Sequence, residues 1–127
     1  MRANGSVSVM VVDDQAPFRG AAKAVLAATD GFELVGEAES GERAVELAAE
    51  LEPEMVLMDI NMSGISGIEA TSQITDQHPD TVVLLISTYQ EADLPASARS
   101  CGAAGYVHKE DLGPDVLARV WEQRLTG

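Results

Sequence analysis

Three aspartates stand at points where the chain leaves an apolar segment. Asp13 and Asp14 directly follow the first apolar segment, and Asp59 directly follows the third. If these segments are neighbouring strands of a parallel sheet, their carboxyl ends open into one crevice and the three carboxylates converge there. Like charges so close together need a cation, and Mg²⁺ or Mn²⁺ could be held by Asp14, Asp59 and the backbone carbonyl of Asn61. An Asp-Asp pair alone is more often a turn or a helix start, but the third carboxylate reverses that preference.

Two further polar residues end strand-length segments later in the chain. Ser87 follows the fourth segment and Lys109 follows the fifth, so both should face the same crevice. Phosphoryl transfer needs a metal and an ammonium to neutralise the phosphoryl oxygens and a hydroxyl to donate a hydrogen bond, all placed around a carboxylate. Asp59 is then the nucleophile. Taken singly, Ser87 could cap a helix and Lys109 could be a surface lysine, so the prediction depends on their joint placement.

The elements that must position these residues can be predicted from the apolar pattern. Short apolar runs without polar alternation predict strands buried on both faces of a parallel sheet, and segments with apolar residues at helical spacing separate them. This alternation predicts a three-layer, doubly wound α/β domain of (βα)5 type, with a flavodoxin-like parallel five-stranded sheet in the order 2-1-3-4-5. The expected strands are Val7–Val12, Phe32–Ala38, Met55–Met58, Val82–Ile86 and Gly105–Val107.

Proline residues predict where two of the helices begin, because proline favours the first turn. Pro114 places the start of the last helix. By the same reasoning, Pro95 predicts that the fourth helix begins near Asp93 or Leu94, and residues 88–92 are left as an irregular, mobile loop.

Composition and charge exclude several classes of function. The 127 residues are 46% hydrophobic, which suits one compact domain. Eight basic and twenty-one acidic residues give a net charge of −13, which should repel nucleic acid and anionic membranes. Neither a membrane-length apolar run nor a signal peptide is visible, and Cys101 is the single cysteine, so we expect a cytoplasmic protein. We expect one domain over residues 1–127, with a loose tail at residues 1–6 and no output domain.

Four ordered motifs, each at a strand end, are the most specific feature of the sequence. They are Val11-Val12-Asp13-Asp14, Met58-Asp59-Ile60-Asn61-Met62, Ser87-Thr88 and Gly105-Tyr106-Val107-His108-Lys109. In these motifs, and from about Ser8 to Leu125, the sequence resembles the bacterial response-regulator receiver family of two-component systems. The sequence is also similar to the sequences of receivers that are attached to LuxR-type helix-turn-helix domains.

The resemblance implies a phosphorylation switch. A sensor histidine kinase or a phosphotransfer protein would donate a phosphoryl group to Asp59. Asp13, Asp14 and Asp59 would hold the metal together with the backbone carbonyl of Asn61. The chain would promote its own Mg²⁺-dependent phosphorylation and dephosphorylation without being an enzyme.

The resemblance also implies how the switch works. Ser87 and Lys109 would bind the phosphoryl group, and Tyr106 would be the aromatic residue that responds. Asn61 and Tyr89 would control dephosphorylation by limiting the access of water. The output surface would be formed by the fourth helix, the fifth strand and the fifth helix. That surface, or the face of the first and fifth helices, could also form a homodimer.

Two alternatives use similar chemistry or the same layers. Haloacid-dehalogenase-like phosphatases also have an aspartate nucleophile with Mg²⁺, but they need a second aspartate two positions later as the general acid. Asn61 occupies that position here, and an amide cannot deliver the proton. A flavin carrier needs a hydroxyl- and glycine-rich loop after the first strand to bind phosphate. The chain has Asp13-Asp14-Gln15-Ala16-Pro17 in that place, which would repel it.

Overall fold

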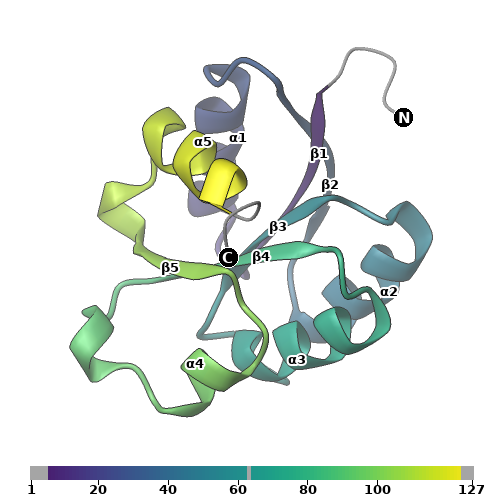
Figure 1. The fold of residues 1–127 in the computed structure, drawn as a ribbon, viewed down its shortest axis with the longest axis vertical. Coiled ribbons are helices and arrows are strands. Elements are labelled where there is room, and N and C mark those ends of the chain that lie inside the picture. The colour runs from purple at the N-terminus through teal and green to yellow at the C-terminus, as the bar shows by residue number, and fades with distance from the viewer. Residues whose placement is uncertain (1–5, 63, 124–127) are drawn as a thin grey trace.

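Strands and helices alternate along the chain in the computed structural model, which describes residues 6–62 and 64–123. Five parallel strands form one sheet in the order β2-β1-β3-β4-β5, as predicted (Figure 1). The strands are β1 (Val7–Val12), β2 (Phe32–Ala38), β3 (Met55–Asp59), β4 (Val82–Ser87) and β5 (Gly105–His108). The helices are α1 (Ala16–Ala27), α2 (Gly41–Leu51), α3 (Gly67–Gln77), α4 (Ser97–Ser100) and α5 (Pro114–Gln123), with short 3-10 helices η1 (Glu91–Asp93) and η2 (Lys109–Asp111).

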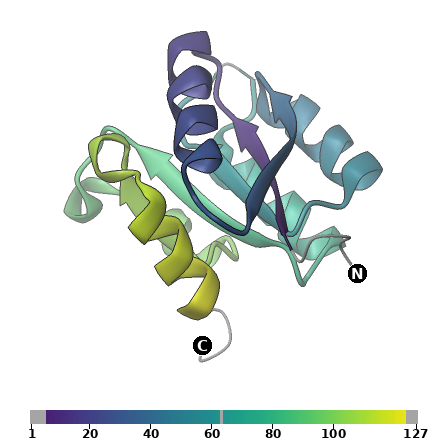
Figure 2. The ribbon, with the colours of Figure 1, turned by 90° about the horizontal axis from the view of Figure 1, so that it is seen from above.

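Helices cover both faces of the sheet and make a three-layer domain (Figures 1 and 2). Successive strand residues point to opposite faces, so a strand covered on both sides must be apolar throughout. β3 and β4 are buried along their whole length. Against α1 and α5 the core contains Val9, Val11, Leu57, Leu84 and Leu117. Against α2, α3 and α4 it contains Met10, Val12, Met58, Leu85 and Ile74.

The segment after β4 differs from the prediction. The sequence predicts a fourth helix beginning near Asp93 or Leu94, but α4 begins at Ser97, and residues 91–93 form η1 instead. Pro95 opposes the earlier start, because a residue that precedes proline is disfavoured in the helical conformation, so Leu94 is a poor first residue for a helix. The carbonyl of Pro95 then accepts from the amide of Ala98 at 3.0 Å and opens a helix of only four residues.

Two other expectations concern the termini and membranes. Of the loose tail expected at residues 1–6, only Ser6 lies within the described residues. Across residues 6–62 and 64–123, no helix combines the length and the apolar character needed to cross a membrane.

Candidate functional site

Three carboxylates gather at the carboxyl ends of β1 and β3, which pair as neighbouring parallel strands. One oxygen from each of Asp13, Asp14 and Asp59 lies within 4.8 Å of the other two. Asp13 is fully buried and Asp59 is 4% exposed, whereas Asp14 is open to solvent. The structure therefore brings together the three aspartates that the sequence analysis expects to converge.

Hydrogen bonds hold Asp13 at the end of β1. Its amide donates to the carbonyl of Ala38 at 3.1 Å, and its Oδ1 accepts from the amide of Gln15 at 2.8 Å. The guanidinium of Arg19 donates to the Asp13 carbonyl at 2.7 Å. The backbone and one carboxylate oxygen of Asp13 are thus fixed, and Oδ2 is left to face the crevice.

The loop between β3 and α3 is held just as closely. The Ile60 carbonyl accepts from the amide of Gly67 at 2.9 Å, and the Ile60 amide donates to the carbonyl of Ile86 at 3.1 Å. A Cβ atom at Gly67 would overlap the carbonyl oxygen of Asp59, so α3 begins in direct contact with the end of β3. From α2, Glu42 Oε2 accepts from the amide of Ile65 at 3.1 Å and ties this loop to a second helix.

Lys109 extends from the end of β5 into the aspartate cluster. Its Nζ lies 2.8 Å from Asp13 Oδ2 and 3.6 Å from Asp59 Oδ1, and its side chain is only 14% exposed. The ammonium also lies 4.6 Å from the centre of the Phe18 ring, within the range of a cation–π contact. The Lys109–Glu110 peptide is trans. One cation therefore reaches two buried carboxylates at once.

The environment of Asp59 changes its acidity. Burial is the largest of the effects that raise the pKa of Asp59 from 3.8 to about 6, and the nearby charges of Asp13 and then Asp14 act in the same direction. Lys109 acts in the opposite direction by its charge and its hydrogen bond, and only partly offsets the burial. Carboxyl groups whose pKa is raised by burial are common at functional sites, whereas aspartates on the surface ionise freely.

The chemistry of the cluster fits a divalent cation. Asp13 Oδ2 is buried, and its close approach to Lys109 Nζ is an ion pair without hydrogen-bond geometry. An oxygen of this kind beside two more carboxylates is the donor set that hard divalent cations take. Asp13, Asp14 and Asp59 could therefore hold a metal ion, with Asp14 on the solvent side. The part expected for the Asn61 carbonyl stays a prediction.

Ser87 and Tyr106 meet at the segment that follows β4. The Ser87 hydroxyl is buried and accepts from the amide of Tyr89 at 3.0 Å. The Tyr106 hydroxyl donates to the carbonyl of Tyr89 and lies 3.4 Å from the carbonyl of Ser87. The aromatic residue predicted to respond thus already contacts the segment that carries the predicted hydroxyl.

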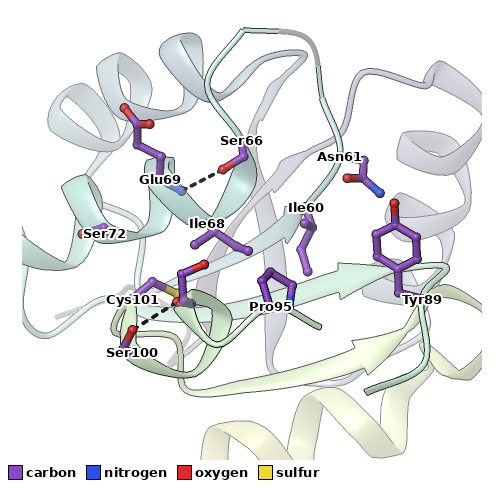
Figure 3. Close-up of a pocket in the computed structure, with 11 residues that line it drawn as sticks. Ile60, Asn61, Ser66, Ile68, Glu69, Ser72, Tyr89, Pro95, Ser100 and Cys101 are labelled. Atoms are coloured by element: carbon purple, nitrogen blue, oxygen red, sulfur yellow. Dashed lines mark hydrogen bonds between the residues drawn. The ribbon is translucent and has the colours of Figure 1, made fainter. Parts of the chain in front are cut away.

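A groove of about 610 Å³ lies between α3 and the segment that includes η1 and α4, and Asn61 and Tyr89 both line it. Figure 3 shows the Tyr89 hydroxyl directed toward the Asn61 amide, and Ile60 and Pro95 also line the groove. Tyr89 is 45% exposed, so its ring stands in solvent beside the end of β3. These are the two residues expected to control the access of water.

Residues 9–120 match the family model for the response regulator receiver domain. The chain belongs to the response-regulator receiver family. Response regulator GacA of Pseudomonas viridiflava is 42% identical over 103 residues, which are 81% of this chain and 48% of GacA. The chain spans about half the length of the curated relatives that it matches.

Solved structures agree with this membership. A LuxR-family two-component response regulator from an Aurantimonas species is 30% identical with a TM-score of 0.84, covering 96% of this chain and 86% of that one. The signal receiver domain of NarL from Mycobacterium tuberculosis is 31% identical with a TM-score of 0.84, covering 92% and 94%. Receiver domains act in phosphorylation-dependent signalling by two-component systems, and this is the functional class of the chain. The haloacid-dehalogenase-like alternative finds no support.

Three residues near the receiver site were missed by the sequence analysis. Gly67 and Glu42 fix the loop after Asp59. The His108 ring contacts the backbone of the residue after Ser87 and of the residue after Lys109. Gly67 could have been suspected, because a glycine at the start of a helix often marks a close backbone approach. Glu42 gave no signal, since an exposed acidic residue in a helix is ordinarily a solvated one.

Proposed function

We propose that this receiver domain accepts a phosphoryl group on Asp59 and that Mg²⁺ bound by the neighbouring aspartates supports the reaction. The observation that carries the proposal is the buried cluster in which Lys109 Nζ lies within 4 Å of oxygens of both Asp13 and Asp59. Such a cation beside a buried, high-pKa carboxylate suits the binding of an incoming phosphoryl group.

In the proposed reaction the Asp59 carboxylate attacks phosphorus. A bond forms between Asp59 oxygen and phosphorus, and the bond from phosphorus to the donor breaks. With a phosphohistidine donor, the imidazole leaves. Lys109 neutralises charge on the phosphoryl oxygens and the Ser87 hydroxyl donates to one of them. A bound Mg²⁺, or Mn²⁺, would neutralise further charge. The domain thereby promotes its own phosphorylation, although it is a switch and not an enzyme.

The response is proposed to travel through the segment after β4. If the Ser87 hydroxyl turns to a phosphoryl oxygen, it can no longer accept from the Tyr89 amide, and the contacts of Tyr106 with that segment must adjust. The surface formed by α4, β5 and α5 then changes shape. Asn61 and Tyr89, which flank the groove, are placed to limit the access of water during dephosphorylation.

We also propose partners for this domain. A sensor histidine kinase or a phosphotransfer protein is the expected donor. The relatives suggest that the receiver serves a longer regulator of the LuxR helix-turn-helix kind, in which DNA binding belongs to a separate part. The net charge of −13 argues against direct contact of this domain with nucleic acid. A homodimer through the α4–β5–α5 surface, or through α1 and α5, is an additional expectation.

The central test is phosphorylation by a small donor. Acetyl phosphate with MgCl₂ should add one phosphoryl group, seen in the intact mass, and chelation of the metal should prevent the addition. Asp59→Asn should abolish it, because an amide cannot act as the nucleophile. Asp30→Asn, an exposed residue in a turn, is the matched control and should react as the wild type does. Equal incorporation by Asp59→Asn would rule out the assignment.

A second test separates the metal site from the phosphoryl site. Asp14→Ala should weaken Mg²⁺ binding by about tenfold or more, because a carboxylate ligand is lost. Lys109→Ala should leave Mg²⁺ binding nearly intact, or strengthen it, while slowing phosphorylation, since the ammonium competes with the metal for Asp13. Both can be measured by magnesium titration and by the rate of mass gain. Loss of Mg²⁺ affinity in Lys109→Ala would contradict the separation.

A further inference from the structure

The side chain of His108, at the end of β5, uses both ring nitrogens. Its Nδ1 accepts from the amide of Glu110 at 3.1 Å, and its Nε2 lies 2.9 Å from the carbonyl of Thr88. A backbone amide can only donate, so Nδ1 must carry no proton. The proton is then on Nε2, which donates to the Thr88 carbonyl. The two contacts therefore select one neutral tautomer.

The residues that the ring contacts flank the two groups that bind phosphoryl in the proposed function. Thr88 directly follows Ser87, and Glu110 directly follows Lys109. His108 is also the partner of Ser87 in the β4–β5 register and the N-cap of η2, the turn that begins at Lys109. One half-buried ring thus joins the backbone behind the hydroxyl to the backbone behind the ammonium.

We propose that His108, in its Nε2-protonated neutral form, is a positioning residue for phosphoryl transfer. The inference rests on the proposed function, because it concerns how Ser87 and Lys109 are held. The ring fixes the Thr88 carbonyl and the Glu110 amide, and through them the directions in which the hydroxyl and the ammonium enter the crevice. Within residues 6–62 and 64–123, the ring makes its hydrogen bonds with the backbone of Thr88 and Glu110, which are not metal-site residues, so its effect should fall on phosphoryl acceptance and spare the metal site.

Three substitutions separate the two contacts. His108→Leu removes both of them. His108→Asn keeps an acceptor at the place of Nδ1, and His108→Gln keeps a donor near the place of Nε2. At saturating Mg²⁺, His108→Leu should slow phosphorylation by acetyl phosphate about fivefold to tenfold, as expected for two lost hydrogen bonds that orient reacting groups. Each of the other two variants should recover part of that loss.

Two further readouts exclude a merely structural role. Magnesium titration of His108→Leu should match the wild type. In the wild type, ¹⁵N NMR of the imidazoles should show His108 with a protonated Nε2 and an unprotonated Nδ1. The chain has only one other histidine, His78, so His78→Gln assigns the two spectra and also serves as the activity control.

Each outcome decides the proposal. The predicted tautomer, together with slowed phosphorylation, partial rescue and unchanged Mg²⁺ affinity, supports it. The opposite tautomer overturns it, as does a wild-type phosphorylation rate in His108→Leu. A loss of Mg²⁺ affinity comparable to that of Asp14→Ala also overturns it, since the effect would then act through the metal. Failure of the wild-type chain to take up phosphate would instead contradict the proposed function and leave the tautomer measurement to decide the contact.

Discussion

The two sides of the crevice are held in different ways. On the acid side, formed by residues 13–15, 59–62 and 64–67, most hydrogen bonds that fix the loops have a backbone group at both ends or bind a backbone group to a side chain, and α3 begins in direct contact with the end of β3. On the switch side, formed by residues 87–111, side chains of Ser87, Tyr106 and His108 hold the segment after β4. The helix there has four residues, whereas α1, α2 and α3 have 12, 11 and 11. Side-chain contacts can be exchanged without unfolding the sheet, so the difference suits one side to hold charge and the other to move.

The sharpest test of this comparison replaces one glycine on each side. Gly67→Ala places a Cβ atom against the Asp59 carbonyl, and the backbone cannot yield easily, so we expect a loss of about 3 kcal/mol in the free energy of unfolding. Gly105→Ala, in β5, meets only Leu84 Cδ1 at 3.6 Å and should change stability by less than about 1 kcal/mol. Urea denaturation measures both. Equal losses would show that the two sides are packed alike.

A second test concerns the charge of the acid side. The pKa of Asp59 is raised to about 6 in the folded protein, so its neutral form favours folding. That contribution is complete below about pH 4 and is lost as the pH rises through about 6. Without metal, Asp59→Asn should therefore stabilise the protein by roughly 1–2 kcal/mol at about pH 7.5 and have little effect at about pH 4.

Thermal unfolding at both pH values, in the presence of a chelator, measures this effect. Added Mg²⁺ should stabilise the wild type and reduce its difference from the variant, because binding to the folded state adds stability. Asp30→Asn is again the control. Stabilisation that persisted at about pH 4 would mean that the variant acts through packing and not through charge.

The smallest expected effect is on the switch side. Tyr106→Phe keeps the ring but removes the hydroxyl that donates to the Tyr89 carbonyl, so stability should fall by only about 0.5–1.5 kcal/mol. Amide exchange at residues 88–90 should become faster, whereas exchange at residues 14 and 15 should not change. Hydrogen-exchange mass spectrometry measures both segments. Faster exchange on both sides would show that they move together.

The two sides also differ in how well sequence reasoning describes them. The strands and the convergence of Asp13, Asp14 and Asp59 were predictable. A continuous apolar run of strand length is typical of a parallel sheet that is buried on both faces, and carboxylates that follow neighbouring strands must lie at the same edge of that sheet. The start of α4 was misplaced, since the rule that favours proline in a first turn was applied without the restriction that proline places on Leu94. Glu42 and His108 depend on contacts across 23 and 20 residues, and no local pattern encodes them.

The contact between Tyr106 and Tyr89 has a practical consequence. These are the only two tyrosines of the chain, and both belong to the switch side. Trp121, the single tryptophan, lies on α5 and packs against the core on the other face of the sheet. Incorporation of fluorinated tyrosine would therefore give two resonances, both from the switch side, without any substitution in the sequence. The tryptophan emission of the same sample would report on α5, on the other face of the sheet.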